Sequence, residues 1–221
     1  MKKKVSILTV CICCLMVVTA FAQKEGKSKL FTGQVKFSMT IEGDVDPQKK
    51  ANMPSEMLYR ICGNKTKTTM NIGIPMHIVE DGDSCKLIRL LDIPGQQIAV
   101  VETKADLDEK HSNYEYRISK TGDTKVICGY ECVGYNVITW SKEDEEEIGS
   151  SLCYTTTEIG SGTTINSAST PGLEGYILYS KVNTSEGYTI ISEAVEVKKM
   201  KVNVAEFLIP SSYRVMSVEE F

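Results

Sequence analysis

Apolar and polar residues alternate along most of this chain, and the alternation predicts β-strands in preference to helices. In residues 34–42, Val35, Phe37, Met39 and Ile41 fall on one face of an extended strand. Comparable runs follow at residues 57–62, 65–71, 75–80, 85–91, 96–101, 114–119, 125–140, 152–158, 173–182, 188–202 and 207–216. The pattern predicts about eleven strands, with a turn at Thr121-Gly122-Asp123.

Short turn signals separate the early runs. Gly63-Asn64, Gly73, Asp81-Gly82-Asp83 and Pro94-Gly95 stand between segments of hairpin length. Glycine, asparagine and aspartate accept the backbone angles of tight turns, and proline presets them. This spacing is typical of antiparallel strands that follow one another as hairpins.

The densest strand-like stretch is residues 125–140, which contains two cysteines and the single tryptophan. From Cys132 onward it alternates as a strand with one buried face does. Gly129 and Gly134 interrupt it, and a glycine inside a strand usually marks a bulge or a bend. We therefore expect one bent strand here, at the centre of a curved sheet.

Only one segment favours a helix. Residues 103–110 begin with Thr103 as a candidate N-cap and carry Leu107 as their sole large apolar residue, so the helix should be short and peripheral. Residues 43–55 are polar and predict a surface connection or one short helical turn. Residues 143–147 predict an acidic hairpin tip, and Pro210 is expected at a bulge or sheet edge.

Residues 160–170 are rich in glycine, serine and threonine. This composition predicts a flexible connection without specific structure, and a mobile flap is the less favoured alternative.

The N-terminus has the pattern of a secretory signal. Lys2, Lys3 and Lys4 precede an apolar run over 5–19, and Ala20-Phe21-Ala22 fits the small-x-small cleavage rule. We expect residues 1–22 to be a signal peptide and residues 23–221 a single domain in the periplasm or cell envelope. A lipid anchor on Cys11 is disfavoured, because the small residue that should precede it is Val10.

The net charge argues against two kinds of partner. Three of the 25 basic residues lie in the leader, so 22 remain against 29 acidic residues, a net charge of −7. A chain of that charge is unsuited to nucleic acid or to docking on anionic lipid by charge alone.

Five cysteines follow the leader, an odd number in a chain that export would permit to form disulfides. They are Cys62, Cys85, Cys128, Cys132 and Cys153. Cys128 and Cys132 can bridge only if the chain turns a tight corner between them, because residues four apart in a strand lie about 13 Å from each other. The favoured alternatives are pairing with other cysteines or buried, reduced thiols.

Catalytic chemistry is not indicated. His77 and His111 are the only histidines, and neither lies in a known motif. The acidic run lacks the spacing of a calcium loop, and Cys128-x-x-x-Cys132 lacks the further ligands that zinc needs. We expect no enzyme activity, metal or cofactor.

Several loose motifs occur in a familiar order. They are Gly63-Asn64-Lys65-Thr66-Lys67, Ile78-Val79-Glu80-Asp81-Gly82, Ile127-Cys128-Gly129-Tyr130-Glu131-Cys132, Gly175-Tyr176-Ile177-Leu178, and Glu206-Phe207-Leu208-Ile209-Pro210 with Tyr213. In this the chain resembles an uncharacterised secreted family common in Bacteroidota, itself similar in layout to the LolA-like superfamily of periplasmic lipoprotein carriers. The resemblance implies a mainly β fold: a strongly curved antiparallel sheet, an open half-barrel, with one or two short helices.

The resemblance also implies a function. We expect a non-enzymatic envelope protein that binds a lipid or a lipoprotein acyl chain on the concave apolar face of the sheet. The alternative is an interaction module that fills the sheet with its own side chains and binds another envelope protein. No individual ligand-binding residue follows from the sequence.

Overall fold

A computed structural model describes residues 30–51, 53–71 and 74–221. The predicted signal peptide, residues 1–22, and its cleavage site lie outside the described residues, so both stay predictions.

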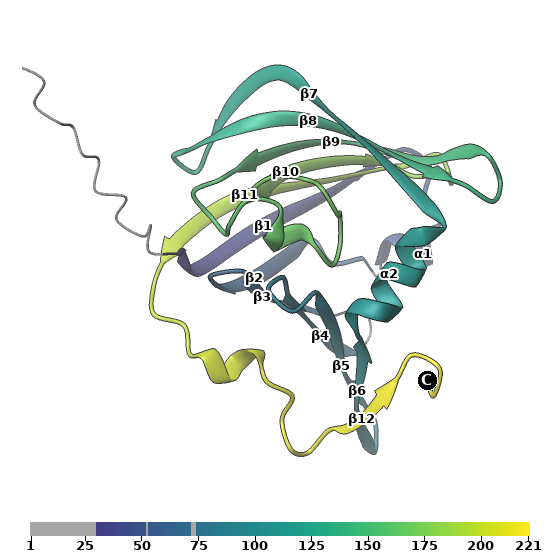
Figure 1. Cartoon of the computed structure of the whole chain (residues 1–221), viewed down its shortest axis with the longest axis vertical. Helices are drawn as coiled ribbons and strands as arrows, with labels where there is room; N and C mark the ends of the chain where they lie inside the picture. The colour runs from purple at the N-terminus through teal and green to yellow at the C-terminus, as the bar shows by residue number, and fades with distance from the viewer. Residues whose placement is uncertain (1–29, 52, 72–73) are drawn as a thin grey trace, which may run out of the picture.

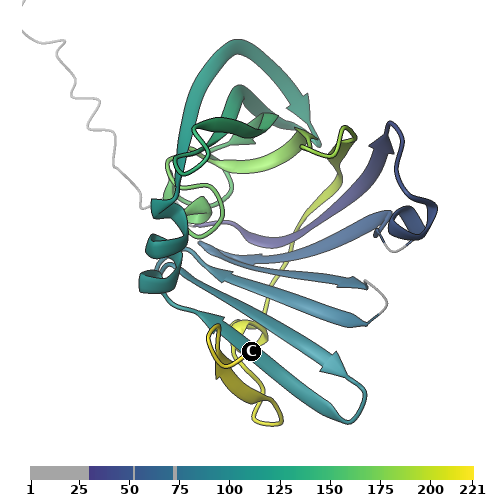
Figure 2. The same cartoon turned by 90° about the vertical axis from the view of Figure 1, so that its right-hand side faces the viewer.

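One twelve-stranded sheet forms the body of the described chain, in the order β12-β6-β5-β4-β3-β2-β1-β11-β10-β9-β8-β7. Its strands are β1 (Thr32–Glu42), β2 (Glu56–Cys62), β3 (Lys65–Asn71), β4 (Pro75–Asp81), β5 (Lys86–Ile93), β6 (Gln96–Glu102), β7 (Tyr114–Ile127), β8 (Tyr130–Ser141), β9 (Glu146–Thr156), β10 (Tyr176–Asn183), β11 (Thr189–Lys199) and β12 (Arg214–Ser217). The sheet curves strongly and stays open (Figures 1 and 2). The predicted fold class is confirmed, with twelve strands where about eleven were expected.

Strand register separates an inner, concave face from an outer one. Val35 and Phe37 of β1 stand opposite Tyr59 and Met57 of β2, and all four point inward. Residues 157–175, between β9 and β10, fold against this inner face (Figure 2), and we call them the plug. The plug and the β2–β3 and β4–β5 turns share one end of the sheet, which we call the floor end.

The opposite end carries the β1–β2 connection and the β10–β11 turn, and we call it the mouth end. The short helix α1 (Pro47–Ala51) lies in the β1–β2 connection, so the predicted helical turn is present.

Helix α2 (Lys104–Ser112) links β6 to β7 and confirms the one predicted helix. Thr103 is its N-cap: the Asp106 backbone N–H donates to Thr103 Oγ1 at 3.4 Å, and the Thr103 N–H donates to Asp106 Oδ2 at 2.7 Å. This reciprocal capping satisfies two backbone donors at the helix start. Leu107 is only 1 % exposed and packs with Leu87 of β5 and Ala168 of the plug.

The prediction of one bent strand over residues 125–140 was wrong. Cys128 and Gly129 have φ of 51° and 85°, and they form a two-residue turn between Ile127 of β7 and Tyr130 of β8. Two consecutive residues with positive φ suit the tight turns whose twist matches that of a hairpin. Conversely, the turn predicted at Thr121-Gly122-Asp123 is a bulge within β7, where the pairing with β8 shifts between Lys120 and Thr124.

A long strand over residues 207–216 was also predicted wrongly. Residues 200–221 form a strap across the outer face of β3–β6 (Figure 1), with a 3₁₀ turn at Val204–Phe207 and only β12 as strand. Val202 and Phe207 of the strap pack on Val79 and Ile88 of the sheet. Proline lacks a backbone N–H, so Pro210 cannot donate within a ladder. The strap is held by these side chains and, further along, by the parallel pairing of β12 with β6, from Arg214 opposite Ile98 to Ser217 opposite Val101.

No helix among the described residues is long and apolar enough to cross a membrane.

Candidate ligand-binding site

The plug fills the floor half of the inner face. Ile159, Ile165 and Leu173 are at most 2 % exposed. Ile159 and Ile165 belong to the main core cluster. Leu173 packs with Tyr135 of β8 and Cys153 of β9. The flexible connection predicted for residues 160–170 was therefore wrong, because a few apolar side chains in this polar segment suffice to dock it.

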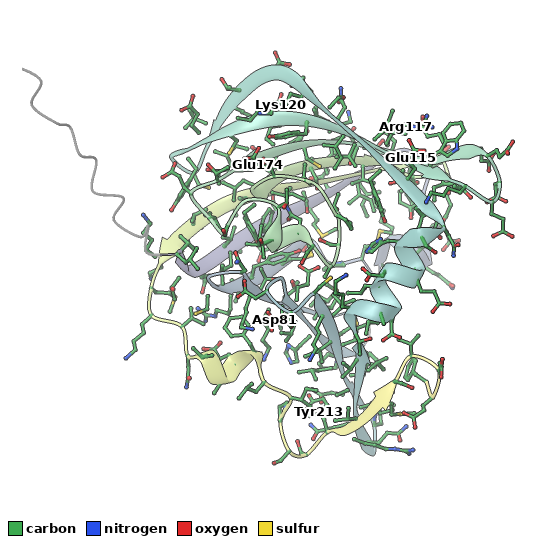
Figure 3. The ribbon with its side chains drawn as sticks, viewed as in Figure 1. Asp81, Glu115, Arg117, Lys120, Glu174 and Tyr213 are labelled. Atoms are coloured by element: carbon green, nitrogen blue, oxygen red, sulfur yellow. The ribbon has the colours of Figure 1, made fainter. Side chains whose placement is uncertain are left out.

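Polar contacts fix the plug as well. Asn166 Nδ2 donates to the carbonyl oxygens of Leu173 at 2.8 Å and Gly175 at 2.6 Å, and Ser167 Oγ donates to the Gly82 carbonyl at 2.9 Å. The Tyr135 hydroxyl donates to Glu174 Oε2 at 3.3 Å, and Figure 3 labels Glu174 where the plug approaches β10. Hydrogen bonds as well as apolar packing therefore hold the plug in one position against the sheet.

Beneath the plug lies a small pocket of about 220 Å³, which we call the floor pocket. Its polar and aromatic lining residues come from β1, β2, β4, β10, β11 and the plug. They are Phe37, Tyr59, Glu80, Asn166, Ser169, Tyr176, Ser180 and Ser192.

Glu80 is the acidic group of the floor pocket. Thr66 Oγ1 donates to Glu80 Oε2 at 3.2 Å. Burial raises the pKa of the Glu80 carboxyl, although hydrogen bonds from Thr66 and Ser169 act in the opposite direction. Burial also raises the pKa of Tyr59 to about 12 and that of Tyr176 well above its usual value, so both phenols stay neutral.

Towards the mouth end the inner face becomes apolar. Among the inward-facing side chains that register places beyond the floor pocket are six half-buried ones on β1–β4 and β11. We call them the mouth residues: Met39, Ile41, Met57, Met70, Met76 and Ile190. The inner face therefore has a covered, partly polar floor and an uncovered, apolar mouth.

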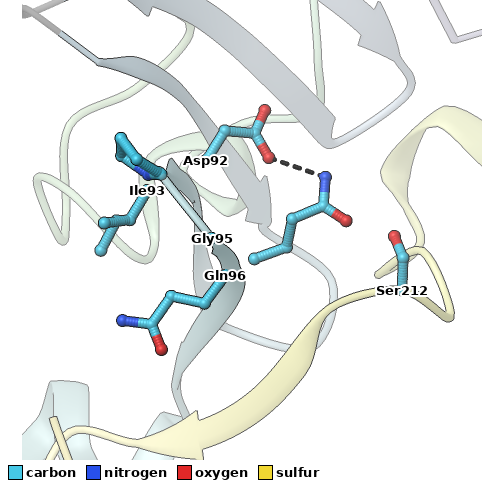
Figure 4. A pocket seen from close by; sticks show the side chains of 7 residues that line it. Asp92, Ile93, Gly95, Gln96 and Ser212 are labelled. Carbon is cyan, nitrogen blue, oxygen red and sulfur yellow. Dashed lines mark hydrogen bonds between the residues drawn. The ribbon is translucent and has the colours of Figure 1, made fainter.

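Two other cavities have local structural explanations. A pocket of about 550 Å³ lies between the β5–β6 turn and Ser212 of the strap (Figure 4). There Asp92 Oδ1 accepts hydrogen bonds from the Tyr213 hydroxyl at 2.6 Å and Gln97 Nε2 at 3.0 Å, and these bonds lower the pKa of Asp92. The pocket is open, and its polar groups anchor the strap.

A third pocket, of about 630 Å³, is formed by α2, the plug and the β4–β5 turn and contains Cys85 and His111. Both ring nitrogens of His111 are engaged: Nδ1 lies 2.8 Å from the Tyr116 hydroxyl and Nε2 lies 3.3 Å from the Ala168 carbonyl oxygen. His77 Nδ1 lies 3.0 Å from Thr69 Oγ1 on the outer face. Each histidine thus has a structural role, and the structure does not bring the two together.

Aromatic rings and charges pair on the outer face. The Arg117 guanidinium lies 4.4 Å from the Trp140 ring centroid and donates to Glu115 Oε1 at 2.8 Å (Figure 3). The single tryptophan therefore lies outside the concave face. The predicted acidic hairpin tip is present between β8 and β9, and no cluster of three metal-ligating side chains occurs within residues 30–51, 53–71 and 74–221.

Five free thiols lie among the described residues: Cys62, Cys85, Cys128, Cys132 and Cys153. Cys128 Sγ donates to the Ala194 carbonyl at 3.2 Å, and Cys132, which is fully buried, lies in β8 with its Sγ 3.6 Å from the Tyr130 carbonyl. A Cys128–Cys132 disulfide across the turn stays a prediction.

The sequence did not identify the floor pocket, although one signal was present. Met76, Ile78 and Glu80 alternate on β4, so Glu80 occupies an inward phase where an apolar residue is expected. A charged residue in the buried phase of a strand marks a candidate site.

Comparisons with known proteins found similar solved structures. No family model matches the chain, and no curated protein matches it. Among solved structures, a β-barrel-like protein with a domain of unknown function from Brucella abortus covers 79 % of this chain and all of its own, at 7 % identity and a TM-score of 0.43. A LolA superfamily protein from Nitrosomonas europaea covers 81 % of this chain and 90 % of its own, at 9 % identity and a TM-score of 0.42.

Proposed function

We propose that this protein is a non-enzymatic carrier or receptor of the cell envelope, which holds the apolar part of a lipid or lipoprotein acyl chain against the mouth residues. One observation carries the proposal: the plug covers the inner face at the floor end, whereas the inward-facing apolar side chains at the mouth end are only half-buried. Apolar area left in a concavity favours an apolar ligand, because burying it removes that area from water.

The chemistry of the mouth supports the same proposal. Four of the six mouth residues are methionines, Met39, Met57, Met70 and Met76, which stand on four adjacent strands. Methionine side chains are flexible and polarisable, so they adapt to ligands of irregular or variable shape. The proposal includes export to the cell envelope, which we infer from the signal-peptide pattern of residues 1–22.

A second candidate is the interaction module with a self-filled sheet. The plug does fill the floor half, and the strap exposes apolar side chains on the outside: Val204, Leu208, Val215, Val218 and Phe221. On this alternative the partner would be another protein that covers the strap, and the concave face would bind no ligand.

Native mass spectrometry tests the carrier proposal on protein purified gently from lipid-containing cells. We expect lipid masses on the folded protein that disappear on denaturation. Met70→Lys, which places a charge in the mouth, should abolish them. Thr69→Lys is the matched control, since Thr69 is the adjacent, exposed residue on the opposite face of β3. Lipid-free wild type, or equal loss in both variants, would contradict the proposal.

A further inference from the structure

The floor pocket has the composition of a cation site. Phe37, Tyr59 and Tyr176 place three aromatic rings around it, with centroids 5.0 Å apart for Phe37–Tyr59 and 6.5 Å apart for Tyr59–Tyr176. Phe37 and Tyr176 are 5 % and 6 % exposed, so the walls are largely shielded from water. The faces of aromatic rings attract ammonium groups, most strongly where water is excluded.

Glu80 adds an acidic side chain to the three rings. Within residues 30–51, 53–71 and 74–221, its carboxylate forms no ion pair. Arg89 also faces inward, on the neighbouring strand β5, but it pairs with Glu102. Glu80 is half-buried. This burial raises the pKa of its carboxyl, because a carboxylate shielded from water without a cation beside it is unfavourable. A positively charged ligand would supply the missing partner.

The other polar groups of the pocket can accept hydrogen bonds. Because Asn166 Nδ2 is used by the Leu173 and Gly175 carbonyls, Asn166 offers a ligand only its carbonyl oxygen Oδ1. Ser180 and Ser192 contribute hydroxyl groups, which accept as well as donate. A primary ammonium has three N–H donors and no acceptor, and so complements this set.

Size and position limit what the pocket takes. A volume of about 220 Å³ is below the 300 Å³ or more usual for drug-sized ligands, so it suits a head group and not an acyl chain. Met39 lies two residues from Phe37 along β1, and Met57 lies two residues from Tyr59 along β2. Both methionines are mouth residues. A polar group in the pocket would thus have its apolar tail against the mouth residues.

We infer that the protein selects amphipathic ligands with a positively charged amine at the polar end, which Glu80 and the rings of Phe37, Tyr59 and Tyr176 hold in the floor pocket. This inference rests on the proposed function, since it assigns the other end of the ligand to the mouth. It excludes free fatty acids as the preferred ligand, because their carboxylate would meet Glu80.

Isothermal titration with three probes of equal chain length tests the inference: decylamine, decanol and decanoate, at pH 7 and below their aggregation thresholds. We expect the ammonium to bind about tenfold or more tightly than decanol, as a buried charge-assisted hydrogen bond allows, and decanoate to bind most weakly. Glu80→Gln should reduce amine affinity to that of decanol while leaving decanol affinity unchanged, which also shows that the variant is folded.

Glu193→Gln is the matched control, because Glu193 lies on β11 among outer-face groups and pairs with Lys125. It should keep the amine preference. Equal affinity for all three probes, or an amine preference that survives Glu80→Gln, would overturn the cation site and leave the carrier proposal standing. Failure of every probe to bind would overturn both.

Discussion

Leu173→Ala is expected to lower the free energy of unfolding by about 2–5 kcal/mol, the range for truncating a fully buried leucine. Leu173 is 0 % exposed and packs on Tyr135, Val137 and Cys153. Truncating its side chain therefore leaves a cavity where the plug contacts strands β8 and β9. Denaturant unfolding followed by circular dichroism measures the change.

Leu208→Ala is the control for that measurement. Leu208 is 64 % exposed on the strap, and its truncation should change the free energy of unfolding by less than about 0.5 kcal/mol. A loss below about 1 kcal/mol for Leu173→Ala would mean that the plug is not an integral part of the core.

Gly82→Ala is expected to displace the plug and to cost about 1–3 kcal/mol, as overpacking does. A β-carbon at Gly82 would stand 2.3 Å from the Thr164 carbonyl oxygen of the plug and 3.0 Å from the Asn64 carbonyl oxygen. Both are backbone atoms, so the strain cannot be relieved by a side-chain rotation. Hydrogen exchange should become faster across residues 160–170.

Gly149→Ala provides the comparison, since a β-carbon there would meet only the Asn183 carbonyl oxygen, at 3.8 Å. Exchange in the plug should match wild type in that variant. If Gly82→Ala leaves exchange across residues 160–170 unchanged, the docking of the plug on the β4–β5 turn is refuted.

Local patterns in the sequence determined much of the fold. The alternation of Val35, Phe37 and Met39 identified β1, and Thr103 with Leu107 identified α2, because each signal lies within a few residues of the structure it specifies. Strand curvature and the count of strands followed from the same local signals and from the resemblance.

The errors arose where long-range contacts outweigh composition. The plug looks flexible in sequence, yet Ile165 and Leu173 are fixed by β-strand residues far away along the chain. The Cys128-Gly129 turn was predicted as a bend because a glycine inside a strand-like run usually marks one, and nothing in the sequence indicated the positive φ of Cys128, which cysteine seldom adopts. The floor pocket gathers Phe37, Glu80 and Tyr176 from three distant strands, and only the register brings them together.

The central claim is that an apolar ligand lies against the mouth residues, and methionine-methyl NMR tests it most directly. With [¹³C-methyl]methionine protein and a soluble lipid analogue, the signals of Met39, Met57, Met70 and Met76 should shift on titration. Those of Met200 and Met216, which lie on the strap, should not. Shifts confined to Met200 and Met216 would favour the interaction module, and no shift at any mouth methionine on ligand saturation would contradict the carrier proposal.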